Sequence, residues 1–458
     1  MSAAPSPSLD LDRLRRTLSG PVFGPDDGDA WDRARRPWSA GVDQHPAAVV
    51  EVTGADDVAA AIGFARENGL GVMAQPTGHA ASWDLHDVVL LRTGALADVE
   101  VDAGARLARL GAGARWRDVQ GAAAGEGLAG LGGTAPHVCV TGYMLGGGLS
   151  WLGRRYGVAA NSVRSFEVVT ADGRRLRADA ESEPDLYWAL RGGGGNYAIV
   201  TGLEIDLVPV PEVYAGNLIF PMGRSGEVLH AWREWVQGVP DETTSLARMV
   251  RVPPLPDIPE PLRGQHLVAV GACHAGTEAE GADVLAPLRA LGPMMDTFAT
   301  MPPAGLGAVH MDPEDPVPSL SSTALVGELP PEAVDRLIEI AGPDSGTPLL
   351  FAELRHLGGA LGRPDPSGGA HGHIDEPFAL HALGVPMGPD HAVAVAAGCE
   401  QVRSAMAPWS TGLILLNFSE RRDAMAASHP PDVLTRLRDV KRRYDPRGLI
   451  QSSHALSG

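Results

Sequence analysis

The chain has 458 residues, of which 44% are hydrophobic and 20% charged, as expected for a globular protein of about two domains. Its formal net charge of −19 argues against nucleic acid or an anionic membrane as a partner. Three widely spaced cysteines, no basic and apolar leader at MSAAPSPSLD and no long apolar run favour a cytoplasmic protein without disulfides or a membrane span.

The N-terminal half shows a regular pattern after residues 1–45, which look polar and irregular. An apolar run at 48–52 predicts a strand. The Thr53–Asp57 segment then starts a helix that ends at Gly69, and the next strand leads into Gln75-Pro-Thr-Gly-His79. Further strands are expected at 71–74, 88–91, 99–101, 107–110, 165–170, 174–178 and 199–207, and helices at 116–124 and 184–190.

The character of the sequence changes near residue 209, where prolines become frequent and loops lengthen. The prolines and glycines of 363–372 predict a loop. A compact pattern returns at the end, with a strand expected at 413–416 and a helix at 433–443. A domain boundary is therefore expected near 209.

Three glycine-rich segments are candidates for ligand contact. The turn Gln75–His79 exposes backbone N–H groups that can hold a pyrophosphate without lysine, although the same letters also fit an ordinary turn. The stretch Gly132–Gly148 combines glycines with apolar residues, which favours an ordered segment that a flat ligand approaches closely. It is neither a GxGxxG fingerprint nor a P-loop. The run Gly192–Asn196 fits close ligand approach or a plain turn equally well.

Seven segments, in this order, carry a resemblance to a known family: PTGHAAS (76–82), GLGGTAPHVCVTGYMLGGGLSWLGRRYG (130–157), VVTADGR (168–174), DLYWALRGGGGNYAIVT (185–201), LRHLGGAL (354–361), LLNFSE (415–420) and LRDVKRRYDPRGLI (437–450). The chain resembles the FAD-linked oxidases of the vanillyl-alcohol oxidase superfamily, and most of all their berberine-bridge-enzyme-like branch. The resemblance implies an α+β fold with a PCMH-type FAD-binding domain at 1–208, an antiparallel-sheet substrate domain at 209–404, and a segment, 405–458, that returns to the FAD domain.

The resemblance also implies roles for individual residues. His79 falls where the family's histidine bonds covalently to the flavin 8α-methyl group. Asn417 would lie near the flavin ring. The residues expected to bind FAD are Gln75, Pro76, Thr77, Gly78, His79, Gly133, Thr134, Pro136, Val138, Cys139, Gly142, Gly146, Gly147, Val200 and Asn417.

Several family positions differ in this chain. The cysteine that gives many relatives a second flavin bond is replaced by Ala135, and Cys139 comes four residues too late, so one covalent bond at most is expected. The tyrosine base of many relatives is replaced by Leu415, and the glutamate base of the alkaloid-oxidising members aligns near Ala379. Both familiar bases are therefore missing.

Other side chains are candidates to replace these bases. His381 lies two residues after Ala379, so on a strand both would face the same side, and a neutral imidazole accepts protons at pH 7. Glu353, with Arg355 and His356, is expected on a neighbouring strand, and Tyr143, Trp151 and Arg154 follow the FAD segment. His381, Tyr143 and Glu353 are the catalytic candidates. No metal site is expected, because His371, His373 and Asp375 match no ligand motif.

The reaction implied is oxidation of a C–H bond next to O or N in a small organic substrate, with O₂ as the expected electron acceptor and bacterial secondary metabolism as a possible setting. Sugars, alkaloids, polyketides and amino-alcohols all fit as substrate classes. Two alternatives stay open: a redox-neutral cyclase or lyase on the same scaffold, and a binding protein that has lost catalysis.

Overall fold

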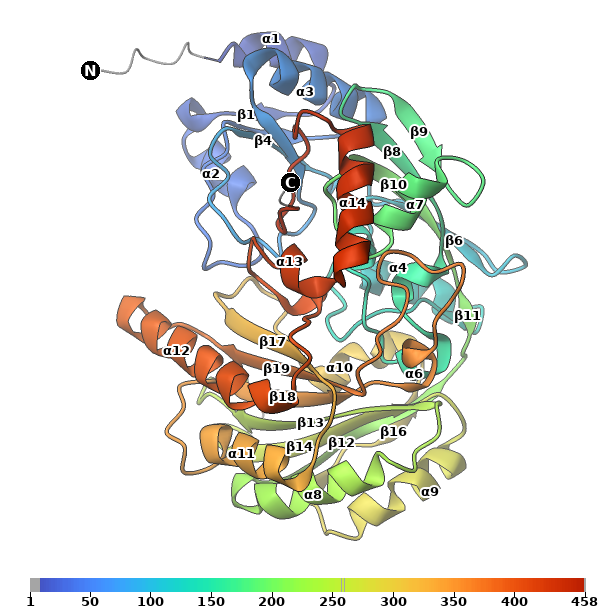
Figure 1. The fold of residues 1–458 in the computed structure, drawn as a ribbon, viewed down its shortest axis with the longest axis vertical. Helices are drawn as coiled ribbons and strands as arrows, with labels where there is room; N and C mark the ends of the chain where they lie inside the picture. Colours follow the sequence, from blue (N-terminus) through green and yellow to red (C-terminus); the bar gives the residue numbers. More distant parts are fainter. Residues whose placement is uncertain (1–8, 257, 259, 457–458) are drawn as a thin grey trace.

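The structure, a computed structural model, describes residues 9–256, 258 and 260–456. The N-terminal part of the chain and its C-terminal end form the upper half of the view in Figure 1, and the intervening residues form a broad sheet with helices beneath it. None of the helices in the described ranges is long and apolar enough to cross a membrane.

Two sheets organise the upper half. The first has the order β1-β2-β4-β3 and is parallel except for β1; its strands are Val22–Phe23 (β1), Ala48–Glu51 (β2), Gly71–Ala74 (β3) and Val88–Arg92 (β4). The second is antiparallel with the order β5-β6-β10-β8-β9; its strands are Val99–Asp102 (β5), Leu107–Gly111 (β6), Val163–Thr170 (β8), Arg175–Ala178 (β9) and Ala198–Asp206 (β10). A short pair joins Leu128–Ala129 (β7) to Val208–Pro209 (β11).

The helices of this half are short. They are Leu11–Thr17 (α1), Asp29–Arg35 (α2), Ala55–Asn68 (α3), Trp116–Ala124 (α4), Val140–Leu145 (α5), Gly153–Tyr156 (α6) and Pro184–Leu190 (α7). Helix α3 buries Val58, Ala61, Ile62 and Ala65, the helical-period residues of the sequence, and ends at Gly69 in the left-handed conformation.

The lower half is built on one eight-stranded antiparallel sheet. Its strands are Val213–Pro221 (β12), Thr243–Arg251 (β13), His266–His274 (β14), Met295–Asp296 (β15), Ala299–Met301 (β16), Leu320–Val326 (β17), Phe351–His356 (β18) and Phe378–Gly384 (β19). Side chains such as Met249, Leu354 and Leu380 point to one face and pack against helices. These helices are Ser225–Trp235 (α8), Glu278–Arg289 (α9), Pro331–Ala341 (α11) and Pro389–Ala405 (α12). The other face is turned toward the upper half (Figure 1).

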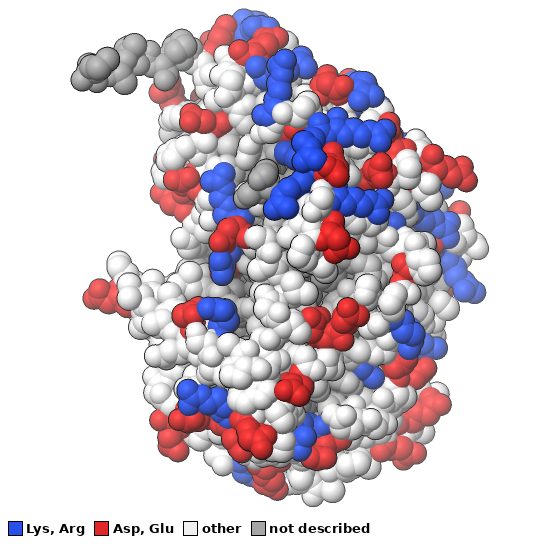
Figure 2. Space-filling view, in the orientation of Figure 1, with Lys and Arg blue, Asp and Glu red and all other residues white. Residues whose placement is uncertain are grey.

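The C-terminal segment crosses back to the upper half. It contains the short helix Met425–Ser428 (α13) and the helix Pro431–Tyr444 (α14), which lies beside α7 and carries Lys441, Arg442 and Arg443 in its last turn. Ile450 forms a bridge with Val72 of β3. Basic side chains gather in the upper part of the face in Figure 2, with acidic ones among them, and Asp185 of α7 pairs with Arg436 and Arg443 of α14.

The fold confirms the expected α+β class with an antiparallel sheet in the second half, and most predicted elements agree to within two residues. Two predictions were wrong. The N-terminal stretch is not irregular throughout, since its described part holds α1, β1 and α2; residues 1–8, including most of the leader segment, lie outside the described residues. The predicted strand 413–416 is instead an extended segment that enters a 3₁₀ turn at Leu416–Phe418. The predicted boundary between 208 and 209 falls within β11.

Asp57, in the first turn of α3, offers a test of the N-terminal fold. Its buried carboxylate accepts hydrogen bonds from the N–H groups of Ser19 (2.8 Å), Gly20 (3.3 Å) and Thr53 (2.8 Å) and from the Thr53 hydroxyl (2.7 Å). Burial raises the pKa of Asp57, but these donors outweigh it and hold the pKa below its ordinary value. We expect Asp57→Asn to lower the free energy of unfolding by about 1.5–3 kcal/mol at pH 7 in urea denaturation.

The sign of the pH effect follows from the lowered pKa. A carboxyl group with a depressed folded-state pKa contributes stability above the unfolded-state value, about 4, and loses it as the pH falls through the folded-state value. The difference between wild type and Asp57→Asn should therefore shrink below about pH 4. Asp56→Asn is the control, because Asp56 is 83% exposed, and it should change stability by less than about 0.5 kcal/mol. Equal losses in both variants would contradict the assignment.

Candidate functional site

A cavity of about 1350 Å³ lies between the upper half and the free face of the large sheet. One wall comes from the Gln75–His79 turn and the 133–146 segment, and the opposite wall from strands β13, β18 and β19. The segment after residue 416 closes one side. Residues from three distant parts of the sequence therefore meet around one space.

Nearly all predicted FAD-binding residues line this cavity. They are Gln75, Pro76, Thr77, Gly78, His79, Gly133, Thr134, Val138, Cys139, Gly142, Gly146, Val200 and Asn417. Two do not line it. The ring of Pro136 faces Gly307 of the lower half, and Gly147 lies against His371.

The Gln75–His79 turn is held in place by residues of the loop between α2 and β2. Buried Gln75 exchanges two side-chain hydrogen bonds with Gln44 (2.8 and 3.0 Å). The carbonyls of Thr77 and Gly78 accept bonds from the N–H groups of Trp38 and Ser39. Gly78 has a φ of +84°, which favours glycine. The paired amides of Gln75 and Gln44 therefore fix the start of the turn.

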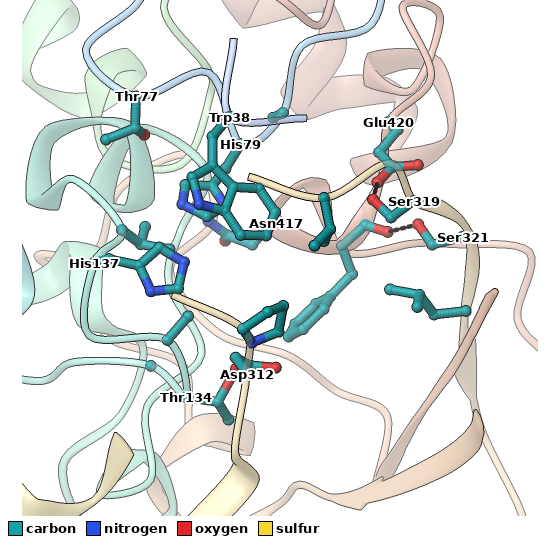
Figure 3. Close-up of a pocket in the computed structure, with 18 of the residues that line it drawn as sticks. Trp38, Thr77, His79, Thr134, His137, Asp312, Ser319, Ser321, Asn417 and Glu420 are labelled. Atoms are coloured by element: carbon teal, nitrogen blue, oxygen red, sulfur yellow. Dashed lines mark hydrogen bonds between the residues drawn. The ribbon is translucent and has the colours of Figure 1, made fainter. Parts of the chain in front are cut away.

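Three aromatic rings stack at this wall (Figure 3). The ring of Trp38 lies 4.0 Å from that of His79 and 5.2 Å from that of His137, and the two imidazoles are 4.7 Å apart. The His79 Nε2 and both ring nitrogens of His137 are buried without a partner among the described residues. Burial lowers the pKa of His79 to about 3, with a further contribution from His137, so the His79 ring is neutral at pH 7.

Unpartnered nitrogens of this kind fit a bound group that the protein itself does not supply. Sequence reasoning missed Trp38 and His137. His137 stands inside the glycine segment, but Trp38 belongs to a stretch with no pattern.

The glycine segment is fastened to the C-terminal segment by Asn417. The Asn417 side chain accepts a bond from the Gly148 N–H (2.8 Å) and donates one to the Tyr143 carbonyl (3.1 Å). A Cβ on Gly146 would lie 2.6 Å from the Asn417 amide nitrogen, so close approach requires glycine there. Cys139 begins α5 with its thiol bonded to the Ala112 carbonyl, and burial raises its pKa to about 11. An unreactive thiol agrees with giving Cys139 no covalent role.

A row of polar side chains crosses the sheet face on the opposite wall. Arg248 pairs with Glu353, Glu353 with His381, and His381 with Thr323, so all four point to the same side. His381 lies between the rings of Phe351 (5.3 Å) and Phe418 (5.0 Å), and its Nδ1 has no described partner. Burial, assisted by Arg355, lowers the pKa of His381 to about 4. The imidazole is therefore a neutral proton acceptor on the cavity wall.

Glu353 lies behind the wall and not on it. Its carboxylate is fully buried and pairs with His310 (2.9 Å) and with Arg355. Burial raises the pKa of Glu353, but these two cations hold it well below its usual range. His310 in turn contacts Asp312 (2.7 Å). Both carboxylate oxygens of Glu353 are bonded to cationic side chains. We therefore assign Glu353 a positioning role and not that of a proton acceptor.

Tyr143 also differs from its predicted role. Its hydroxyl donates to the Leu131 carbonyl (3.1 Å), its ring packs edge-on against Trp116, and burial strongly raises its pKa. Tyr143 lines the cavity but its hydroxyl is committed, so we give it a packing role. Trp151 and Arg154 do not line the large cavity; Arg154 donates to the Thr243 carbonyl and joins the two halves.

The two positions at which the family resemblance implied a base lie close together. Leu415 and Ala379 are buried in one apolar cluster, with neighbours such as Leu325. The positions that carry bases in relatives are therefore part of the core in this chain.

Glu420 is a further cavity residue that sequence reasoning missed. It accepts a bond from the Ser319 hydroxyl (2.7 Å), and Ser321 lies beside the pair (Figure 3). Burial raises the pKa of Glu420 above its ordinary value. Its only sequence signal was its place three residues after Asn417.

Among the described residues, no three His, Cys, Asp or Glu side chains gather in a way that could hold a metal ion. His371 lies under the glycine loops, with its ring 5.7 Å from that of His429, whereas His381 is on the sheet. His373 contacts Asp375 only at the surface.

Comparisons with known proteins agree with this arrangement. A family model described as "FAD binding domain" matches residues 46–179. The FAD-dependent monooxygenase prx3 of Penicillium roqueforti is 32% identical over 203 residues, 43% of this chain and 40% of its own, so the chain spans about two fifths of that relative. The (R)-6-hydroxynicotine oxidase of Paenarthrobacter nicotinovorans is 26% identical over 96% of this chain and 97% of its own.

The fold is shared with the berberine-bridge-enzyme-like protein 1 of Physcomitrella patens, with a TM-score of 0.85, 18% identity and coverage of 98% of this chain and 99% of that one. The matched family model covers the whole of the 75–79 turn and of the 133–146 segment that face the cavity. The chain therefore carries an FAD-binding domain within residues 46–179, and it has the fold of the berberine-bridge-enzyme-like flavoproteins.

Proposed function

We propose that the protein is an FAD-dependent oxidase that removes hydride from a C–H bond next to O or N of a small organic substrate. The observation that carries the proposal is the large cavity. One of its walls is the FAD-domain turn and glycine segment, and its other wall presents a neutral imidazole, His381, whose Nδ1 has no partner among the described residues. When bound, FAD supplies the hydride acceptor and passes the electrons to O₂.

The residues of the first wall fit this cofactor. Backbone N–H groups of the 75–79 and 133–142 segments would hold the pyrophosphate and ribityl chain, as positive-φ and glycine-rich backbone does for anions elsewhere. The buried Nε2 of His79 has no described partner, which fits a covalent bond from this histidine to the flavin. Ala135 and the bonded thiol of Cys139 leave no cysteine in the segment for a second attachment.

The residues of the second wall would handle the substrate proton. His381 is neutral and faces the cavity, so one of its ring nitrogens would take the O–H or N–H proton of the substrate. Glu353, Arg355 and His310 would position the neighbouring groups. Glu420, with its raised pKa, is a second titratable group in the cavity, on the side closed by the segment after residue 416.

The test is the absorption spectrum of the purified protein, followed by a screen of alcohols and amines under O₂ with detection of hydrogen peroxide. We expect flavin absorbance, bleaching of the flavin by a substrate without O₂, and peroxide when O₂ is present. A flavin-loaded protein that converts a substrate without bleaching or peroxide would favour a redox-neutral cyclase or lyase. A colourless protein that takes up no added FAD would overturn the proposal.

A further inference from the structure

The cavity wall beside His381 carries a buried cluster of charged groups that the proposed reaction does not require. Arg248 and Arg355 both line the cavity and are only 6% and 7% exposed. They flank Glu353 on the same sheet face, since Arg248 pairs with Glu353 and Arg355 is two residues further along β18. His310, the last residue of the short helix Gly307–His310 (α10), and Asp312 just after it complete the cluster.

Both carboxylates of this cluster are occupied by other groups than Arg248. Glu353 contacts Arg355 and His310, and Asp312 contacts His310. Within the described part of the chain, Arg248 forms no ion pair with either carboxylate; its side chain donates to a backbone carbonyl. A buried cation without a carboxylate partner is costly unless an anion joins it.

Arg248 therefore has donors left for a ligand. Its Nη1 donates to the His310 carbonyl (3.1 Å), but its Nε is buried without a partner among the described residues. Arg355, by contrast, is bonded to Glu353 and lies 4.6 Å over the Phe418 ring. Arg248 lines a cavity whose nearby wall is apolar, with Phe351, Val250 and Leu383.

We propose that Arg248, with Arg355, binds the carboxylate of the substrate, and that the substrate is an apolar or aromatic carboxylic acid carrying the oxidisable C–H bond. The proposal rests on the proposed oxidase function. A guanidinium presents parallel donors that match a planar carboxylate. One guanidinium without a carboxylate partner matches the charge of a monoanion, whereas a phosphate dianion would exceed it. The apolar side chains of Phe351, Val250 and Leu383 would contact the rest of the acid.

The test is calorimetric titration of the flavin-loaded protein with benzoate and with its neutral isostere benzamide. We expect benzoate to bind at least about tenfold more tightly than benzamide, and Arg248→Met to remove that preference. Arg251→Met is the matched control on the same strand, because its guanidinium donates to the carbonyls of Ala341 and Gly342 instead. The control should keep the preference for benzoate.

Flavin content is read from the visible spectrum before each titration, so that a protein without flavin counts against the oxidase proposal. Equal affinity of the flavin-loaded wild type for benzoate and benzamide would overturn the carboxylate proposal alone. A second result would also overturn it: Arg248→Met without ligand has a changed flavin spectrum but keeps its preference for benzoate. Arg248 would then act on the flavin and not on the substrate carboxylate. The wild-type comparison holds even if a variant fails to fold.

Discussion

Replacing His79 with alanine is expected to move the yellow colour of the acid-precipitated protein from the pellet to the supernatant. A histidine attacks a flavin methyl group only as the neutral ring, and burial lowers the pKa of His79 to about 3, so the nucleophile is present at pH 7. Its Nε2 makes no hydrogen bond to a described residue that attachment would break. The measurement is the flavin absorbance of each fraction, with nearly all covalent flavin lost in His79→Ala.

The neighbouring His137 provides the matched control. Its ring lies 4.7 Å from that of His79, is 4% exposed and has both nitrogens unpartnered among the described residues. His137→Ala should keep the colour in the pellet. If His137→Ala lost the covalent flavin and His79→Ala kept it, the bond would be at His137 and the assignment to His79 would be wrong. If the wild-type colour were found in the supernatant, the protein would still bind flavin, but not covalently.

The glycine segments could be recognised from sequence because their chemistry is local. The Gln75–His79 turn and the 133–146 segment contact the cavity through backbone and small side chains that are close together along the chain. The residues at the opposite wall could not be assembled in this way. Arg248, Glu353 and His381 are distant in sequence, and only the strand order β13-β18-β19 and its register bring them together.

Alternation along a strand predicts which side chains share a face, but not which strands are neighbours. His381 was therefore placed on a face correctly, whereas the partners that occupy Glu353 were not foreseen. The apolar run 413–416 shows a second difficulty. It reads as a strand, but the chain turns at Leu416–Phe418 so that Asn417 reaches Gly148, a constraint from 269 residues away.

Lys441, the chain's single lysine, is expected to be one of its most sensitive positions. Its Nζ donates to the carbonyls of Asn196 and Ile450 (2.7 Å each) and pairs with Asp445 (2.5 Å), whose side chain is fully buried. The ammonium therefore joins α14 to the glycine loop and to the segment that bridges β3. Lys441→Met leaves the Asp445 charge buried and unpaired, which should lower the free energy of unfolding by about 3–5 kcal/mol.

The measurement is urea denaturation of the flavin-loaded protein, with Arg442→Met as the control on the same helix. Arg442 pairs with Asp439, but both side chains are more than half exposed, so its loss should change stability by less than about 1 kcal/mol. Adding Asp445→Asn to Lys441→Met should recover part of the loss, because the unpaired charge is then removed. If Lys441→Met and Arg442→Met were equally mild, the ion pair would contribute no more than a surface pair, and the C-terminal segment would be held mainly by its apolar contacts, such as Leu437 and Val440.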